Sequence, residues 1–114
     1  MIFAVATDEL ALYTFSSEMQ ATSYCEGLDV EAAGWLFWDD IGRPLSPYFT
    51  VPNKRGVLTV QNGEYYLELA DEMHHALLSE ALDEITDFSS TTSFNTALEV
   101  RLYMAHQIAM KLNS

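Results

Sequence analysis

Three histidines come nearest, by type and spacing, to a metal-binding site in this sequence. Asp71 and His75 stand at positions i and i+4, so they would share one face of a helix, and His106 on a later helix would supply a third ligand. His74 and His75 are adjacent, however, and adjacent helix residues point about 100° apart, so both cannot easily face one ion. We interpret them as solvated or partly buried helix histidines and expect no metal site and no cofactor.

Two neighbouring carboxylates, Asp39 and Asp40, are the residue type that general acid–base catalysis uses. They lie between Trp38 and Gly42, where the chemistry of a tight turn accounts for them without catalysis. Cys25 is a single cysteine and is expected to be a small buried apolar residue. The sequence contains no P-loop, dinucleotide-binding, nucleophile-elbow or HExxH motif. We therefore expect no catalytic residues and no enzyme activity.

Size and composition predict one domain over residues 1–114. Apolar residues make up 49% of the 114, which is enough for one core. No apolar run reaches the length of about 18 residues that a membrane span needs. The segment from Met1 to Glu9 lacks the positive start of a signal peptide, and Cys25 can form no internal disulfide. These features predict a cytoplasmic protein.

Charge restricts the kind of partner. The chain has 17 acidic residues against five Lys and Arg, a formal net charge of −12. Such a field repels phosphate backbones and anionic lipids, so we expect no nucleic-acid or membrane binding, whereas encounter with basic proteins is favoured. Residues 56–100 contain nine acids and no lysine or arginine, which indicates a one-signed patch. A general contribution to solubility is the alternative reading.

Hydrophobic patterning predicts strands and helices in the order β-β-α-β-β-β-β-α-α. The strands are expected over residues 1–6, 10–15, 34–38, 44–51, 57–60 and 65–69. Asn62-Gly63 is expected to form the hairpin turn between the last two. Prolines 44, 47 and 52 indicate that the fourth strand lies at an edge or is broken.

Capping and periodicity predict three helices. The first begins at a Ser16 or Ser17 cap and ends at Gly27, and the second spans 71–85. The third runs from a Thr92 or Ser93 cap to about residue 112, with an apolar stripe that includes Phe94, Leu98, Leu102, Ala105, Ala109 and Leu112. We predict an α+β fold, an antiparallel sheet of about five or six strands with about three helices, two of them C-terminal, packed on one face.

Several segments of the first 70 residues carry a family resemblance. A short hairpin ends in Tyr13-Thr14-Phe15 and leads to a Ser-capped helix, and the sequences YCEGLDVE, WLFWDDIGRPL and GEYYL follow it. This pattern resembles small bacterial immunity proteins encoded beside polymorphic toxins, including those of contact-dependent growth inhibition. The resemblance does not extend to the two C-terminal helices. It implies a cognate toxin domain, often a basic nuclease, bound and silenced in a one-to-one complex, and it implies no particular contact residues.

The acidic excess fits such a partner independently, because a nuclease needs a positive groove and carboxylates accept bidentate arginine contacts. We predict inhibition of the basic toxin C-terminal domain by steric blocking and charge pairing. Trp38, if exposed, or Tyr66 would anchor the contact. The expected toxin-binding residues are Trp38, Asp39, Asp40, Tyr66, Glu68, Asp71, Glu72, Glu80, Asp83, Glu84 and Asp87.

Two other functions remain open at the level of sequence. The first is a phage-type inhibitor that mimics nucleic acid and acts on a host nuclease or DNA-binding protein. The second is a structural module that dimerises through the broad apolar face of the last helix.

Overall fold

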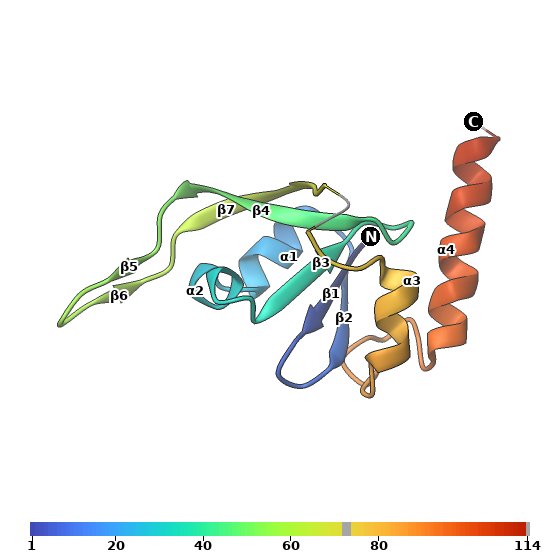
Figure 1. The fold of residues 1–114 in the computed structure, drawn as a ribbon, viewed down its shortest axis with the longest axis horizontal. Helices are drawn as coiled ribbons and strands as arrows, with labels where there is room; N and C mark the ends of the chain where they lie inside the picture. The colour runs from blue at the N-terminus through green and yellow to red at the C-terminus, as the bar shows by residue number, and fades with distance from the viewer. Residues whose placement is uncertain (72–73, 114) are drawn as a thin grey trace.

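Five strands form an antiparallel sheet in the order β2-β1-β3-β4-β7 in the computed structural model, which describes residues 1–71 and 74–113 (Figure 1). They are β1 (Ile2–Ala6), β2 (Ala11–Phe15), β3 (Trp35–Trp38), β4 (Pro44–Val51) and β7 (Glu64–Leu69). Two short strands, β5 (Lys54–Arg55) and β6 (Val60–Gln61), form a separate ribbon that extends away from the sheet. The predicted α+β class and antiparallel sheet are confirmed.

Helices lie on both faces of this sheet. α1 (Glu18–Tyr24) supplies Ala21, its C-cap supplies Cys25 and α2 (Gly27–Glu31) supplies Val30 to one apolar cluster with Phe37 and Tyr65. The two C-terminal helices, α3 (Leu78–Ala81) with the 3₁₀ turn η1 (Leu82–Glu84) and α4 (Ala97–Leu112), contribute to a second cluster on the opposite face. The two C-terminal helices therefore pack together on one face of the sheet, as predicted, and α1 and α2 cover the other face.

Alternation along the strands divides the core between the two faces. Trp35 and Phe37 belong to the cluster under α1 and α2, whereas Leu36 and Trp38 belong to the cluster under α3 and α4. The strand predicted over residues 34–38 implies this division, because successive strand side chains point to opposite faces. The Ser17 cap of α1 was predicted as well, and its side chain accepts a hydrogen bond from the Gln20 backbone N–H.

The predicted hairpin turn at Asn62-Gly63 is wrong. The turn of the ribbon lies at residues 56–59, where the Gly56 N–H donates to the Thr59 carbonyl, and Asn62 and Gly63 lie between β6 and β7. Asn62 instead accepts a hydrogen bond from the Leu28 N–H of α2. A Cβ at Gly63 would lie 2.0 Å from the Val51 carbonyl oxygen, so glycine is required by the close approach of two backbones.

The proline-containing strand β4 was predicted to lie at an edge or to be broken. It lies between β3 and β7 in the sheet order, but it pairs with β3 only at residues 44 and 45, and its register with β7 shifts between Phe49 and Val51, so it is irregular as predicted. Gly27 does not end α1, because it is the buried first residue of α2. A Cβ at Gly27 would lie 2.5 Å from Asn53 Oδ1, at the base of the ribbon. Gly27 and Gly63 therefore permit α2 and the base of the ribbon to pack closely.

The helix predicted over residues 71–85 is shorter in the structure. Of this range, Glu72 and Met73 lie outside the described residues, and α3 begins only at Leu78. Tertiary hydrogen bonds hold the segment before it: Trp38 Nε1 donates to the Ala76 carbonyl, and the Leu78 N–H donates to the Gly42 carbonyl. Contacts with the sheet thus override the helical periodicity there.

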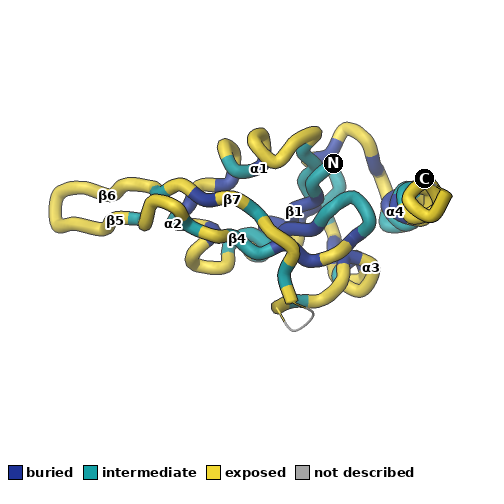
Figure 2. The backbone as a smooth tube through the Cα atoms, turned by 90° about the horizontal axis from the view of Figure 1, so that it is seen from above, coloured by how far each residue is buried: buried dark blue, intermediate teal, exposed yellow. Residues whose placement is uncertain are grey.

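The last helix begins later than predicted and turns a different face to the core. Thr96, not Thr92 or Ser93, caps α4 by accepting from the Glu99 N–H. Val100 and Met104 are its buried residues, so the predicted stripe along Leu98, Leu102 and Leu112 points to solvent. α4 stands at one end of the long axis of the molecule and the ribbon stands at the other (Figures 1 and 2). No helix in the described part of the chain is long and apolar enough to cross a bilayer.

Candidate protein-binding surface

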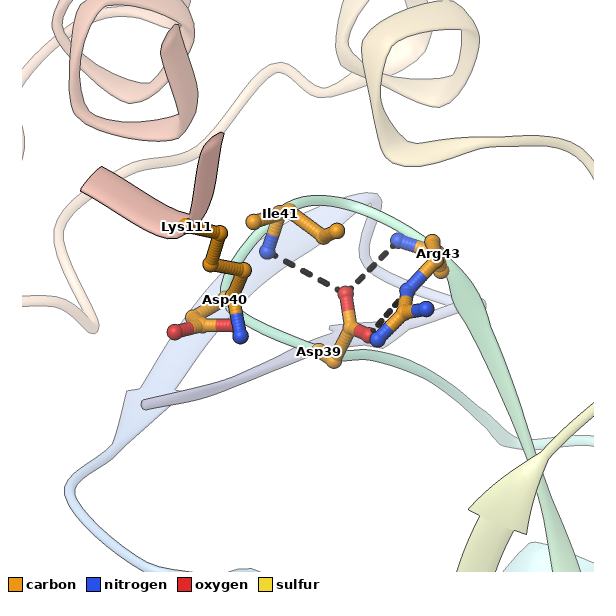
Figure 3. Close-up of polar contacts among 5 residues, drawn as sticks. All are labelled: Asp39, Asp40, Ile41, Arg43 and Lys111. Atoms are coloured by element: carbon orange, nitrogen blue, oxygen red, sulfur yellow. Dashed lines mark hydrogen bonds and ion pairs between the residues drawn. The ribbon is translucent and has the colours of Figure 1, made fainter. Parts of the chain in front are cut away.

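The β3–β4 turn shows how the structure uses Asp39 (Figure 3). Asp39 Oδ1 accepts backbone hydrogen bonds from Ile41 at 3.1 Å and Arg43 at 2.9 Å, and Oδ2 accepts from Arg43 Nε at 2.7 Å. Only 15% of the Asp39 side chain is exposed. The carboxylate therefore organises the turn, as turn chemistry predicted, and is turned away from any partner.

Two more of the predicted contact carboxylates are paired within the molecule. Asp40 Oδ1 lies 3.7 Å from Lys111 Nζ near the end of α4, and Asp83 Oδ1 lies 2.8 Å from Arg101 Nη2. Asp87 accepts hydrogen bonds from the Ser89 N–H and hydroxyl, which lower the pKa of Asp87. These residues join loops and helices and do not form an uncommitted acidic face.

The remaining predicted acids lie at separate places. Glu68 is exposed on β7, Glu80 and Glu84 are exposed on α3 and η1, and Asp71 is exposed after β7. Glu72 lies outside the described residues. The structure therefore does not bring the predicted carboxylates together as one continuous surface.

Trp38 is buried and cannot anchor a partner in this structure. It is 1% exposed, it packs in the cluster under α3 and α4, and its indole N–H donates to the Ala76 carbonyl at 2.8 Å. The prediction that Trp38 contributes to a binding surface is thereby corrected. The cause is the contact of the indole with His75 and Ala76, which precede α3.

His74 and His75 contact each other, and His75 packs against the sheet, whereas His106 is exposed on α4. His75 Nε2 lies 3.0 Å from the Phe37 carbonyl oxygen, its ring packs edge-on against Trp38, and His74 Nδ1 lies 2.6 Å from His75 Nδ1. Burial of His75 lowers its pKa, so the neutral imidazole is favoured. Among residues 1–71 and 74–113, no group of three His, Cys, Asp or Glu side chains is placed to hold a metal ion.

An exposed tyrosine pair marks the part of the sheet that α3 and α4 leave uncovered. Tyr48 on β4 is opposite Tyr66 on β7, and their ring centroids lie 5.2 Å apart. The two residues are 54% and 42% exposed. Glu68 follows Tyr66 on the same face, two residues along the strand. Burial and the nearby Glu68 raise the pKa of Tyr66, so the phenol stays protonated as a hydrogen-bond donor.

A cleft of about 770 Å³ continues this surface toward α3. The strand register leads from Tyr48–Tyr66 through Ser46–Glu68 to Pro44 and Ala70, whose backbone N–H donates to the Pro44 carbonyl at 3.0 Å. The described residues that line the cleft are Arg43, Pro44, Leu69, Ala70, His75, Ala76, Leu77 and Glu80. We call the tyrosine pair, Glu68 and this cleft the tyrosine–cleft surface. It combines apolar and aromatic area with two exposed carboxylates, a composition suited to protein contacts.

Sequence reasoning identified Tyr66, Glu68 and Glu80 of this surface but missed Tyr48, Ala70 and Leu77. Tyr48 lies in a strand whose prolines suggested an irregular edge. Strand alternation could have indicated its exposure, because Tyr48 points to the opposite face of the sheet from its half-buried neighbours Pro47 and Phe49. Leu77 falls inside the helix predicted over residues 71–85, but it precedes α3 in the structure and is 46% exposed.

Charge is distributed over the molecule in two parts. All 17 acids lie outside the ribbon of residues 54–61. The three bases outside the ribbon, Arg43, Arg101 and Lys111, each pair with an aspartate. The other two, Lys54 and Arg55, form β5. The residues outside the ribbon thus carry the whole acidic excess, and their lysine and arginine side chains are held in ion pairs.

Comparison with known proteins gives no match: no family model, no curated protein and no solved structure is similar to this chain.

Proposed function

We propose that this chain is an immunity protein, which binds a basic toxin domain one-to-one in the cytoplasm and blocks its active site without doing chemistry itself. The observation that carries the proposal is the tyrosine–cleft surface on a body whose own cations are already paired. The surface offers anchors, and the field of the body brings a cationic partner to them.

The tyrosines supply most of the binding energy in this proposal. Tyr48 and Tyr66 present large rigid rings at a low entropic cost, and such residues dominate protein interfaces. Glu68 and Glu80 are exposed and form no ion pair with a described residue, so each is available to a lysine or arginine of the toxin. Asp39, Asp40 and Asp83 are each neutralised by an ion pair within the molecule, so they do not enter the contact.

A growth assay tests this function. The chain is co-expressed with the toxic C-terminal domain encoded by the neighbouring gene, and survival is compared with cells that express the toxin alone. Wild type is expected to restore growth, and Tyr48→Ala with Tyr66→Ala is expected to lose the protection. Val57→Ser, at the exposed turn of the ribbon, is the matched control and should protect as wild type does. Failure of the wild-type chain to protect would refute the immunity function.

A further inference from the structure

The solvent side of α4 carries a regular apolar stripe. Its members are Leu98, Leu102, Ala105, Ala109 and Leu112, which follow one another at spacings of four, three, four and three residues. The three leucines are 63%, 62% and 80% exposed. This is the heptad spacing of a coiled-coil seam, and it lies roughly opposite the face on which Val100 and Met104 are buried.

The stripe is complementary to itself when two such helices run antiparallel. In one register Leu98 lies against Ala109 of the second copy, and Leu102 lies against Ala105 of the second copy. Each layer then sets a large side chain against a small one, which allows close helix packing. A two-fold axis repeats these layers on both sides, as an isologous dimer requires.

The charges beside the stripe favour the antiparallel direction. Glu99 and His106 flank one side of the stripe, and Arg101 and Ile108 flank the other. Antiparallel pairing sets Glu99 beside His106 of the second copy, whereas parallel pairing sets Arg101 beside His106 of the second copy. The helix itself contains one acid and two bases, unlike the rest of the body. Because α4 stands at one end of the long axis, a two-fold axis through it keeps the two acidic bodies apart (Figure 2).

We propose that α4 is a homodimer interface, in which two copies of this chain pair their α4 helices antiparallel through Leu98, Leu102, Ala105 and Ala109. The interface shares no residue with the tyrosine–cleft surface, although Ala105 of the stripe and Leu77 of the cleft line one pocket between the two surfaces. Four residues on one helix make a small interface, and the dimer is therefore concentration-dependent.

Light scattering after gel filtration tests the proposal. At a protein concentration of about 100 µM, above the Kd expected of a small interface, wild type should show a mass close to twice the 12.8 kDa of the chain. Leu102→Glu should be monomeric with an unchanged circular dichroism spectrum. Leu58→Glu is the matched control, because this leucine is 93% exposed on the ribbon, and it should dimerise as wild type does. A monomeric wild type, or dimers of Leu102→Glu, would overturn the proposal.

Crosslinking tests the direction of the helices. Cys25 is buried, so a cysteine introduced on α4 is the accessible thiol. In the antiparallel register the two copies of residue 105 lie about 5 Å apart along the axis and the two copies of residue 98 about 16 Å apart. A short bis-maleimide should therefore link Ala105→Cys at least ~10-fold faster than Leu98→Cys. Equal rates at both positions would indicate parallel helices and contradict the arrangement.

Discussion

The indole nitrogen of Trp38 donates a 2.8 Å hydrogen bond to the carbonyl oxygen of Ala76, and this contact joins the last residue of β3 to the segment before α3. It closes the apolar cluster over Trp38 and places Leu77 and Glu80 at the cleft. The hydrogen bond explains why Trp38 is unavailable to a partner. It also explains why residues 75–77 line the cleft opposite the ends of β4 and β7.

Removal of that hydrogen bond should weaken the fold by a measurable amount. Trp38→Phe keeps an aromatic ring in the cluster but leaves the Ala76 carbonyl without its donor and creates space, so we expect a loss of about 2–4 kcal/mol in the free energy of unfolding. Urea denaturation followed by circular dichroism measures this. Trp35→Phe, at a half-buried position of the same strand, should cost less. An unfolding midpoint equal to that of wild type would contradict the role of the bond.

The β3–β4 turn predicts different effects for its two aspartates. Asp39→Ala removes the acceptor for two backbone N–H groups and the Arg43 side chain, and should cost about 1–3 kcal/mol. Asp40→Ala removes a single 3.7 Å ion pair with Lys111 and should change stability by less than about 1 kcal/mol. Chemical denaturation of both variants checks the order. Equal losses would mean that Asp39 does not organise the turn.

Stability should fall on mild acidification because of His75. Burial lowers the pKa of His75 in the folded state, so the unfolded chain binds the proton more readily. The stabilisation is present above the unfolded pKa of about 6.5 and is lost as the pH falls from there through the folded pKa. Urea unfolding between pH 7.5 and pH 5.5, a range of about 2 units around that pKa, measures the slope.

The variant that isolates this pH effect is His75→Gln. Glutamine at position 75 retains an N–H donor for the Phe37 carbonyl but cannot titrate, so the slope should become smaller. A His75→Gln protein with the wild-type slope would refute the assignment.

Cys25 should be unreactive until the protein unfolds. Burial raises the pKa of the Cys25 thiol from 9.0 to about 12, and the side chain is fully buried. The thiolate fraction at neutral pH is then about 10³-fold smaller than for an ordinary thiol. We expect no labelling by a thiol reagent in native buffer and complete labelling in denaturant. Rapid labelling of the native protein would contradict the packing of α1 against the sheet.

The sequence predicted the parts of the fold that local rules decide. The Ser17 cap depends on a side chain three residues from the group it binds, and the division of residues 35–38 depends only on strand alternation. Neither needs information about distant segments. The same holds for the hairpin of β1 and β2 and for the α+β class.

The errors arose where distant segments meet. Asn62-Gly63 has the composition of a turn. In the structure, however, the Asn62 side chain accepts a hydrogen bond from α2, and Gly63 lies so close to the β4 backbone that a Cβ would not fit. Leu98 and Leu102 have core spacing, but the sheet accepts the other face of α4. For the candidate site, residue type indicated Tyr66 and Glu68, whereas Tyr48 and the cleft required the β4–β7 register.

Titration calorimetry with the neighbouring toxin domain tests the central claim most directly. We predict one-to-one binding that weakens as salt rises and becomes at least ~10-fold weaker in each of Tyr48→Ala and Tyr66→Ala, since both rings are anchors of the proposed contact. Asp83→Asn alters the ion pair with Arg101 at a residue that does not line the cleft, and it should bind within ~3-fold of wild type. Binding of both tyrosine variants with wild-type affinity would contradict the tyrosine–cleft surface, and no binding by the wild-type chain would contradict the proposed function.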